Sequence, residues 1–301
     1  MLRGRARRPQ LIRVIAAFVA ASLLLAGCGN AGRRSAATAG QGAGAALPAP
    51  DSPLPHAAAA LADRLTATSR KLGAAVDRWV EQGDPAHGEP PDDVTLLALD
   101  EQRIYRFLAH HPDVARAATR RLSPAQRVRA RTTIEALRGL RRLAAGWPRR
   151  PLRAYRTQPA LPAGELLRLY RRAQRRFRVG WHVLAAVNLV ESSFGRLRSD
   201  SAAGAQGPMQ FMPATWRVYG MGGDIQDPRD AIPAAANLLR HDGAPRDYTR
   251  ALHAYNPSPL YVDAVLAYAR QMARHPRRYY ALYSWQVFVR TRAGERRLTG
   301  P

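Results

Sequence analysis

Residues 179–195 read VGWHVLAAVNLVESSFG, an apolar run that ends in a carboxylate. The run up to Val190 is apolar nearly all round, apart from His182 and Asn188, and it predicts a buried central helix rather than a surface helix. Burial disfavours the charged form of a carboxyl group and raises its pKa, which is what a general acid needs near neutral pH. Glu191 is therefore a candidate catalytic residue, and a glutamate that caps the helix or pairs with a cation is the alternative interpretation.

The chain after this helix is rich in glycine and alanine, and residues 204–216 read GAQGPMQFMPATW. Glycine lets the backbone come close to a ligand. Met209 and Gln210 are expected to open a new helix, whose free N–H groups can face hydrogen-bond acceptors. Further along, Ala254-Tyr255-Asn256 is followed by Tyr261-Val262.

Together these elements resemble the catalytic domain of the soluble-type lytic transglycosylases, the lysozyme-like enzymes of glycoside hydrolase family 23. In that family a Glu-Ser pair ends the central helix, and a Gly-x-Met-Gln turn, a Met-Pro-x-Thr segment and an Ala-Tyr-Asn element follow in this order. The matching segments here are Glu191-Ser192, Gly207-Pro208-Met209-Gln210, Met212-Pro213-Ala214-Thr215 and Ala254-Tyr255-Asn256. One departure is Pro208, where many members carry Leu, because proline removes a backbone N–H.

The resemblance covers residues 164–275 and implies that Glu191 is the single catalytic acid/base. It implies cleavage of the bond between N-acetylmuramic acid (MurNAc) and N-acetylglucosamine (GlcNAc) in peptidoglycan, with a 1,6-anhydromuramoyl end as product. Met209 and Gln210 would line the sugar cleft, and Tyr255 and Asn256 would position Glu191 or the substrate. The full set of candidate substrate-binding residues is Ser192, Ser193, Gly207, Met209, Gln210, Tyr255 and Asn256.

Two alternatives remain open at this point. Glycosidases with two carboxylates are the common kind, and the nearest acids to Glu191 in sequence, Asp200 and Asp224, lie in expected loops. Either one would make the protein a hydrolysing lysozyme of the same fold. The other alternative is a non-catalytic lipoprotein that binds peptidoglycan through the same cleft. No cofactor and no metal are expected, because the histidines lack the spacing of a metal site.

The chain is strongly basic, with 47 Lys and Arg against 22 Asp and Glu and a net charge of +25, and Lys71 is its only lysine. Such an excess predicts attraction to polyanions. A GC-rich coding habit explains the arginine bias equally well. The single cysteine excludes an internal disulfide and any metal site built from cysteines.

The N-terminus has the order of a secretory signal, since five arginines within residues 1–13 precede an apolar run over residues 14–26. That run is shorter than the roughly 20 residues that span a bilayer. It closes with Leu25-Ala26-Gly27-Cys28, which resembles the lipobox of bacterial lipoproteins, in which the cysteine is acylated. The alternative is an ordinary cleavage site that contains a spare cysteine.

These features predict an exported protein that a lipid on Cys28 anchors to the outer face of the bacterial cytoplasmic membrane, or to the periplasmic side of a membrane. The expected partners are peptidoglycan glycan strands and that membrane. Nucleic acid is not an expected partner of an exported protein, and the sequence points to no protein partner.

The expected fold is mainly α, with a lysozyme-like catalytic domain behind an all-helical N-terminal region and a short C-terminal β-hairpin. Helices are expected to end at Gly83, to break at His111-Pro112 and to start again at Ser123-Pro124. The expected segments are a lipoprotein signal peptide (1–28), a disordered Ala/Gly/Pro tether (29–57), a helical region of unknown role (58–148), a Pro-rich connector (149–163), the lysozyme-like domain (164–275) and a C-terminal tail (276–301).

Overall fold

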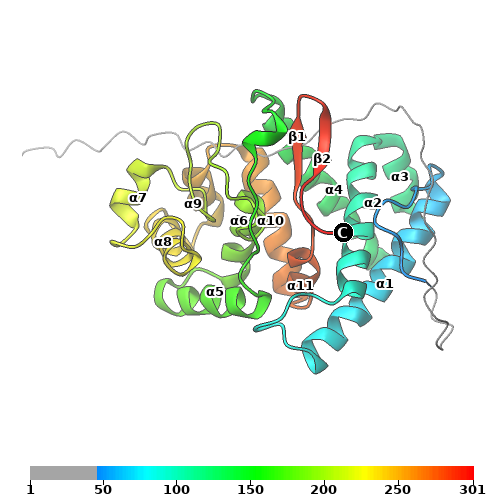
Figure 1. Cartoon of the computed structure of the whole chain (residues 1–301), viewed down its shortest axis with the longest axis horizontal. Coiled ribbons are helices and arrows are strands. Elements are labelled where there is room, and N and C mark those ends of the chain that lie inside the picture. The colour runs from blue at the N-terminus through cyan, green and yellow to red at the C-terminus, as the bar shows by residue number, and fades with distance from the viewer. Residues whose placement is uncertain (1–45) are drawn as a thin grey trace, which may run out of the picture.

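A computed structural model describes residues 46–301 (Figure 1). The predicted signal peptide, Cys28 and the first part of the predicted tether lie outside the described residues. The described chain is mainly helical and carries one short β-hairpin near its C-terminus, so the predicted fold class is confirmed. None of the helices between residues 46 and 301 has the length and apolar character that crossing a membrane requires.

The elements follow one another with short connections. In chain order they are α1 (Ala58–Gln82), α2 (Asp92–His110), α3 (Pro112–Arg120), α4 (Pro124–Ala145), a 3-10 turn η1 (Leu152–Ala154), α5 (Ala163–Phe177), α6 (Trp181–Ser192), α7 (Pro213–Tyr219), α8 (Pro228–His241), α9 (Tyr248–Tyr255), α10 (Pro259–Arg274), α11 (Arg278–Tyr283), β1 (Phe288–Thr291) and β2 (Gly294–Arg297). Helices α9 and α11 were not predicted from the sequence.

The N-terminal helices begin and end where the sequence predicts. Helix α1 stops before Gly83, and His111 separates α2 from α3. The side chain of Ser123 accepts a hydrogen bond from the backbone N–H of Gln126, which caps α4 ahead of a first-turn proline. Gly83, the proline after His111 and the Ser123 cap therefore mark the boundaries in this region.

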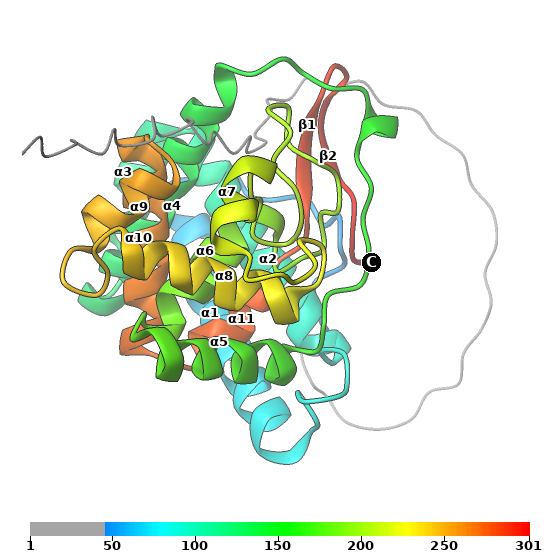
Figure 2. The ribbon, with the colours of Figure 1, turned by 90° about the vertical axis from the view of Figure 1, so that its left-hand side faces the viewer.

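Helix α6 lies at the centre of the molecule, and residues 183–192 are all buried. Helices α5, α8, α10 and α11 all contact it. Figure 1 shows α6 and α10 side by side with α5 beneath them, and Figure 2 shows α8 in front of α6. A helix that is covered on every side needs apolar residues on every side, so this burial explains the sequence of α6.

The N-terminal helices and the rest of the chain share one core. Helix α10 packs against α4 as well as α6. Gln102 on α2 exchanges two hydrogen bonds of 2.9 Å with the backbone of Gln286, just before the hairpin. The predicted helical region is thus packed directly against the segment that follows it.

A buried ion pair also crosses this boundary. Nη1 of Arg278 on α11 lies 2.6 Å from Oε2 of Glu101 on α2, and the two side chains are 8% and 1% exposed. The hydroxyl of Ser69 on α1 donates to Oε1 of Glu101 at 2.8 Å. Because burying two charges is costly unless they stay paired, this pair fixes α11 against α1 and α2.

The C-terminal segment is an integral part of the fold. The predicted hairpin is present, with Phe288 opposite Arg297 in an antiparallel pair. The hydroxyls of Tyr279 and Tyr283 donate to the backbone carbonyls of Ala163 and Leu161 at 2.8 and 2.9 Å. The stretch predicted as a tail therefore also packs against the N-terminal end of α5.

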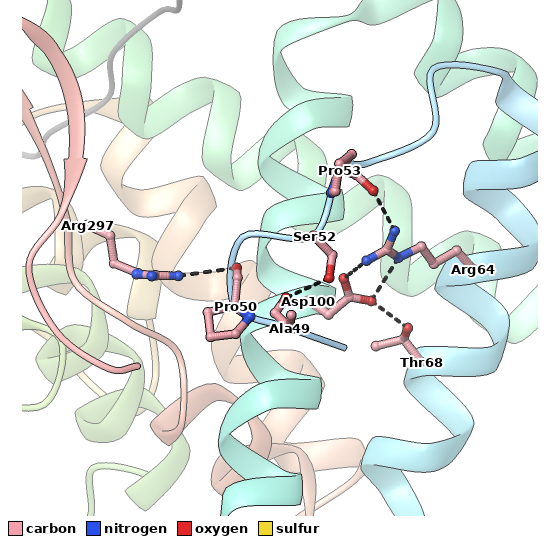
Figure 3. Close-up of polar contacts among 8 residues, drawn as sticks. All are labelled: Ala49, Pro50, Ser52, Pro53, Arg64, Thr68, Asp100 and Arg297. Carbon is pink, nitrogen blue, oxygen red and sulfur yellow. Dashed lines mark hydrogen bonds and ion pairs between the residues drawn. The ribbon is translucent and has the colours of Figure 1, made fainter. Parts of the chain in front are cut away.

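The described end of the predicted tether, residues 46–57, is held by two arginines (Figure 3). Arg64 on α1 donates to the carbonyl of Pro53 at 2.8 Å and to the carboxylate of Asp100 at 2.6 Å. Arg297 on β2 donates to the carbonyl of Pro50 at 3.3 Å. This part of the chain thus follows a defined path between α1, α2 and the hairpin.

We expect Glu101→Ala to destabilise the protein by about 3–5 kcal/mol, because it leaves the Arg278 guanidinium buried without its counterion. Urea denaturation measures the change. Arg116→Ala is the matched control, since it removes an ion pair with Asp113 whose side chains are 70% and 87% exposed, and we expect a loss of under about 1 kcal/mol. Equal losses for the two variants would contradict a structural role for the buried pair.

Candidate active site

Glu191 lies at the C-terminal end of α6 and is 3% exposed. Neither oxygen of its carboxyl group has a hydrogen-bond partner among the described residues. Burial raises its pKa from the ordinary value of 4.5 to about 8, and the nearby hydroxyl of Tyr261 opposes this shift without reaching hydrogen-bond geometry. The side chain is therefore protonated at neutral pH, as a general acid must be.

Two polar residues of α6 hold the glycine-rich loop against this end of the helix. The Ser192 hydroxyl and the Asn188 amide both donate to the carbonyl of Pro208, at 2.5 and 2.8 Å. The hydroxyl of Tyr170 in turn donates to the Asn188 side-chain carbonyl at 2.5 Å. Ser192 is buried within this network, which gives it a role in positioning the loop.

Residues 206–211 form a tight turn. The backbones of Gln206 and Phe211 exchange hydrogen bonds of 2.8 and 2.9 Å, and Gly207 and Gln210 both have positive φ angles. A Cβ atom on Gly207 would lie 1.8 Å from the carbonyl oxygen of Ile225, so only glycine fits there. The prediction that Met209 and Gln210 open a helix is wrong, because the positive φ at Gln210 interrupts the helical path and α7 begins only at Pro213.

Tyr255 and Met209 connect this turn to α9. The hydroxyl of Tyr255 donates to the carbonyl of Met209 at 2.6 Å, and the side chain of Met209 is fully buried. Tyr255 and Tyr261 are close enough to Glu191 for its charge to raise the pKa of both hydroxyls, although burial is the larger cause. The side chains of Tyr255, Tyr261 and Glu191, which come from three separate helices, therefore lie close together at the C-terminal end of α6.

Several buried polar atoms at this place have no partner among the described residues. They are both carboxyl oxygens of Glu191, the hydroxyl of Tyr261 and the side-chain amide nitrogen of Asn256. Buried polar groups are almost always hydrogen-bonded, so such a group of exceptions marks a place where a ligand completes the bonding. Tyr261 is absent from the predicted site residues, and its position shortly after the Ala-Tyr-Asn element was the available signal.

Glu191 and Gln210 form one side of a hollow at the surface. The loop after α6 adds Ser199, Asp200 and Ser201 to the lining. The rest of the lining comes mostly from segments distant in sequence, and it includes Trp147, Arg149, Arg150, Tyr155 and Arg290. The sequence did not predict that these residues line the hollow, because no local pattern links the connector or the hairpin to Glu191.

The remaining predicted residues lie around this hollow without lining it. Ser193 is half-buried and faces a different cavity, between α2, α4 and α10. Gly207 and Met209 belong to the turn, Tyr255 binds the turn through the carbonyl of Met209, and Asn256 is buried next to Tyr255 in the chain. Of the two aspartates proposed as a second acid, Asp200 lines the hollow and Asp224 does not.

The family comparison fits this arrangement. Residues 168–276 match the family model for the transglycosylase SLT domain. No curated protein and no solved structure matches the chain. The match runs from within α5 to just past α10, so it includes Glu191, the turn at Gly207 and the whole of α9.

The match supports a lytic transglycosylase-type domain with a lysozyme-like fold over residues 168–276, and it implies that this domain binds peptidoglycan. Within residues 46–301, no three His, Cys, Asp or Glu side chains gather in a way that would hold a metal ion. The connector and the hairpin that complete the hollow lie outside the SLT domain, on either side of it in sequence.

We expect Glu191→Gln to stabilise the protein increasingly as the pH rises from about 4.5 to about 8. In this range the folded state retains a proton on Glu191 that the unfolded chain has released, so Glu191 contributes a fall of about 1.4 kcal/mol per pH unit to the unfolding free energy of the unaltered protein. The glutamine side chain has nearly the same shape as that of glutamic acid and does not titrate. Urea denaturation of both proteins across this range measures the difference, and a difference that is constant with pH would contradict a raised pKa.

Proposed function

We propose that the protein is a peptidoglycan lytic transglycosylase that cleaves the β-1,4 bond between MurNAc and GlcNAc and leaves 1,6-anhydromuramoyl ends. The observation that carries this proposal is the carboxyl group of Glu191, which is buried, unpartnered among the described residues, protonated at neutral pH and placed at a surface hollow of the SLT domain. We assign both the acid and the base step to this one residue.

In the first step the Glu191 carboxyl group donates its proton to the glycosidic oxygen, and the bond from that oxygen to C1 of MurNAc breaks. The carbonyl oxygen of the 2-acetamido group stabilises the positive charge that develops at C1. The Glu191 carboxylate then takes the proton of the muramoyl 6-hydroxyl while the oxygen of that hydroxyl bonds to C1. The first proton stays on the 4-hydroxyl of the released GlcNAc, the second restores the Glu191 carboxyl group, and no water is consumed.

The surroundings of Glu191 suit both steps. Apolar neighbours keep the acid protonated before cleavage. Once the proton has left, the same lack of partners leaves the carboxylate a strong base, because few groups stabilise its charge. The unpartnered hydroxyl of Tyr261 and the amide of Asn256 are available to orient the substrate or the acid.

Hydrolysis is the second candidate, and the position of Asp200 favours it specifically. Asp200 lines the same hollow as Glu191, and a second carboxylate that aims a water molecule would make the enzyme a lysozyme. Asp224 is a poorer candidate, because its side chain accepts from the backbone of Gln226 in a separate turn. Binding of glycan without catalysis remains the alternative outside the enzymes.

The experiment is mass spectrometry of the muropeptides that the protein releases from purified peptidoglycan. We expect anhydromuramoyl products from the unaltered chain and a loss of at least about a hundredfold in rate for Glu191→Gln, since general acid catalysis contributes about that much. Asp200→Asn is the matched control and should release the same anhydro products at a similar rate.

Each other outcome changes the assignment. Reducing ends, one water heavier, that disappear in Asp200→Asn would establish a lysozyme with two carboxylates. Glu191→Gln protein that cleaves at the unaltered rate would refute the role of Glu191. Binding to peptidoglycan without any release would leave a glycan-binding protein.

We further propose that the protein is exported as a lipoprotein, acylated on Cys28 and held at the outer face of the cytoplasmic membrane or the periplasmic side of a membrane. The basic residues and apolar run before Cys28 support this, as does the remaining basic charge, which assists a lipid anchor on anionic membranes. We expect labelled palmitate to be incorporated into the unaltered chain and not into Cys28→Ser, which should leave the membrane fraction. Label retained by Cys28→Ser would contradict the proposal.

A further inference from the structure

Three arginines line the same hollow as Glu191 and Gln210 and give it a cationic surface. We call Arg149, Arg150 and Arg290 the arginine wall. Arg149 and Arg150 belong to the connector, and Arg290 belongs to β1. None of them lies in residues 168–276, so the SLT domain match assigns them no role.

Backbone pairing holds this wall in place. Arg150 pairs in parallel with Thr291 at the end of β1, and Thr157 pairs with Leu197 in the loop after α6. The Tyr155 hydroxyl donates to the carbonyl of Arg290 at 3.0 Å. Figure 1 shows the connector, in green, running beside β1. The wall is therefore attached both to the hairpin and to the loop that follows Glu191.

No carboxylate within residues 46–301 pairs with any arginine of the wall. Arg150 donates to the backbone carbonyl of Asp200 at 2.7 Å, and Arg290 to that of Ala144 at 3.2 Å. The Arg149 guanidinium has no hydrogen-bond partner in the described chain. Donors therefore remain free on a surface that is fixed in shape.

The arginines also repel one another. The pKa of Arg290 is lowered first by burial and then by the charges of Arg149 and Arg141. The acids of the hollow are Asp200 and Glu191, and Glu191 is neutral at neutral pH. Like charges held together in this way are costly unless an anion neutralises them, so the hollow is complementary to a bound anion.

We propose that the arginine wall binds the carboxylates of the peptides that muramoyl residues carry, and that the enzyme prefers peptide-bearing glycan strands to bare ones. The inference rests on the proposed function. The sugars of the strand are uncharged, and the peptide on the lactyl ether of MurNAc supplies the carboxylates. A guanidinium matches a carboxylate with two parallel hydrogen bonds. The wall and Glu191 share one hollow, so the bound peptide belongs to a sugar at or near the cleaved bond.

The test compares three substrates with the full chain in detergent. They are peptidoglycan freed of phosphate polymers by acid, the same material with its peptides removed by an amidase and the lactyl carboxylates that this frees converted to amides, and the same material with its peptide carboxylates converted to amides. The unaltered enzyme should show the highest kcat/KM on the first substrate and lower, similar values on the other two. Because phosphate has been removed, carboxylates are the anions that distinguish these materials.

Arg149→Gln is the main variant, because no hydrogen bond of the described structure depends on its guanidinium. We expect about a tenfold loss in kcat/KM on the first substrate, the lower end of what a charge-assisted hydrogen bond contributes, and no loss on the other two. Arg290→Gln should behave similarly, with partial recovery in Arg290→Lys. Arg175→Gln, which removes an exposed charge on α5 outside the hollow, is the matched control and should change nothing.

Equal losses on all three substrates, or no loss on the first, would overturn the role of the wall. A loss in Arg175→Gln as large as in Arg149→Gln would also overturn it, since total charge would then be the cause. If the unaltered chain releases no product from any of the three substrates, the proposed function fails instead, so the two failures are distinguishable.

Discussion

The desolvation of Glu191 is the constraint on which the rest of the structure depends. Its carboxyl group stays neutral at neutral pH because α6 is covered on every side and offers no hydrogen bond to its oxygens. Helices α5, α8, α10 and α11 provide that cover, and α10 is in turn supported by α4. The N-terminal helices therefore contribute to the chemistry of the site through packing, although they lie outside the SLT domain.

The same helix end that isolates Glu191 also organises the chain around it. Asn188 is the one polar side chain in the middle of α6, and with Ser192 it fixes the carbonyl of Pro208. The departure from the family pattern at Pro208 is compatible with this network, because the network uses the carbonyl of that residue and not its missing N–H. The turn at Gly207 thereby lies against the acid without contributing any charge to it.

Local patterns predicted a large part of this fold. Apolar periodicity and capping residues located α1 to α8 and α10, and the all-apolar character of α6 indicated its central position before any contact was known. The helix start at Met209 was wrong because the positive φ of Gln210 arises from pairing across the turn, which sequence periodicity does not describe. The arginine wall and the position of Asp200 were also out of reach, since both depend on pairings between segments far apart in the chain.

The hairpin and the connector complete a hollow that residues 168–276 line only in part. Residues 168–276 carry the acid and the turn beneath it, yet the rest of the hollow is lined by chain that precedes and follows this range. A chain that shared only residues 168–276 with this protein would keep Glu191 and its turn but would line the hollow with different flanking residues. Changes in the flanking chain would then alter the charge of the hollow while helix α6 stays the same.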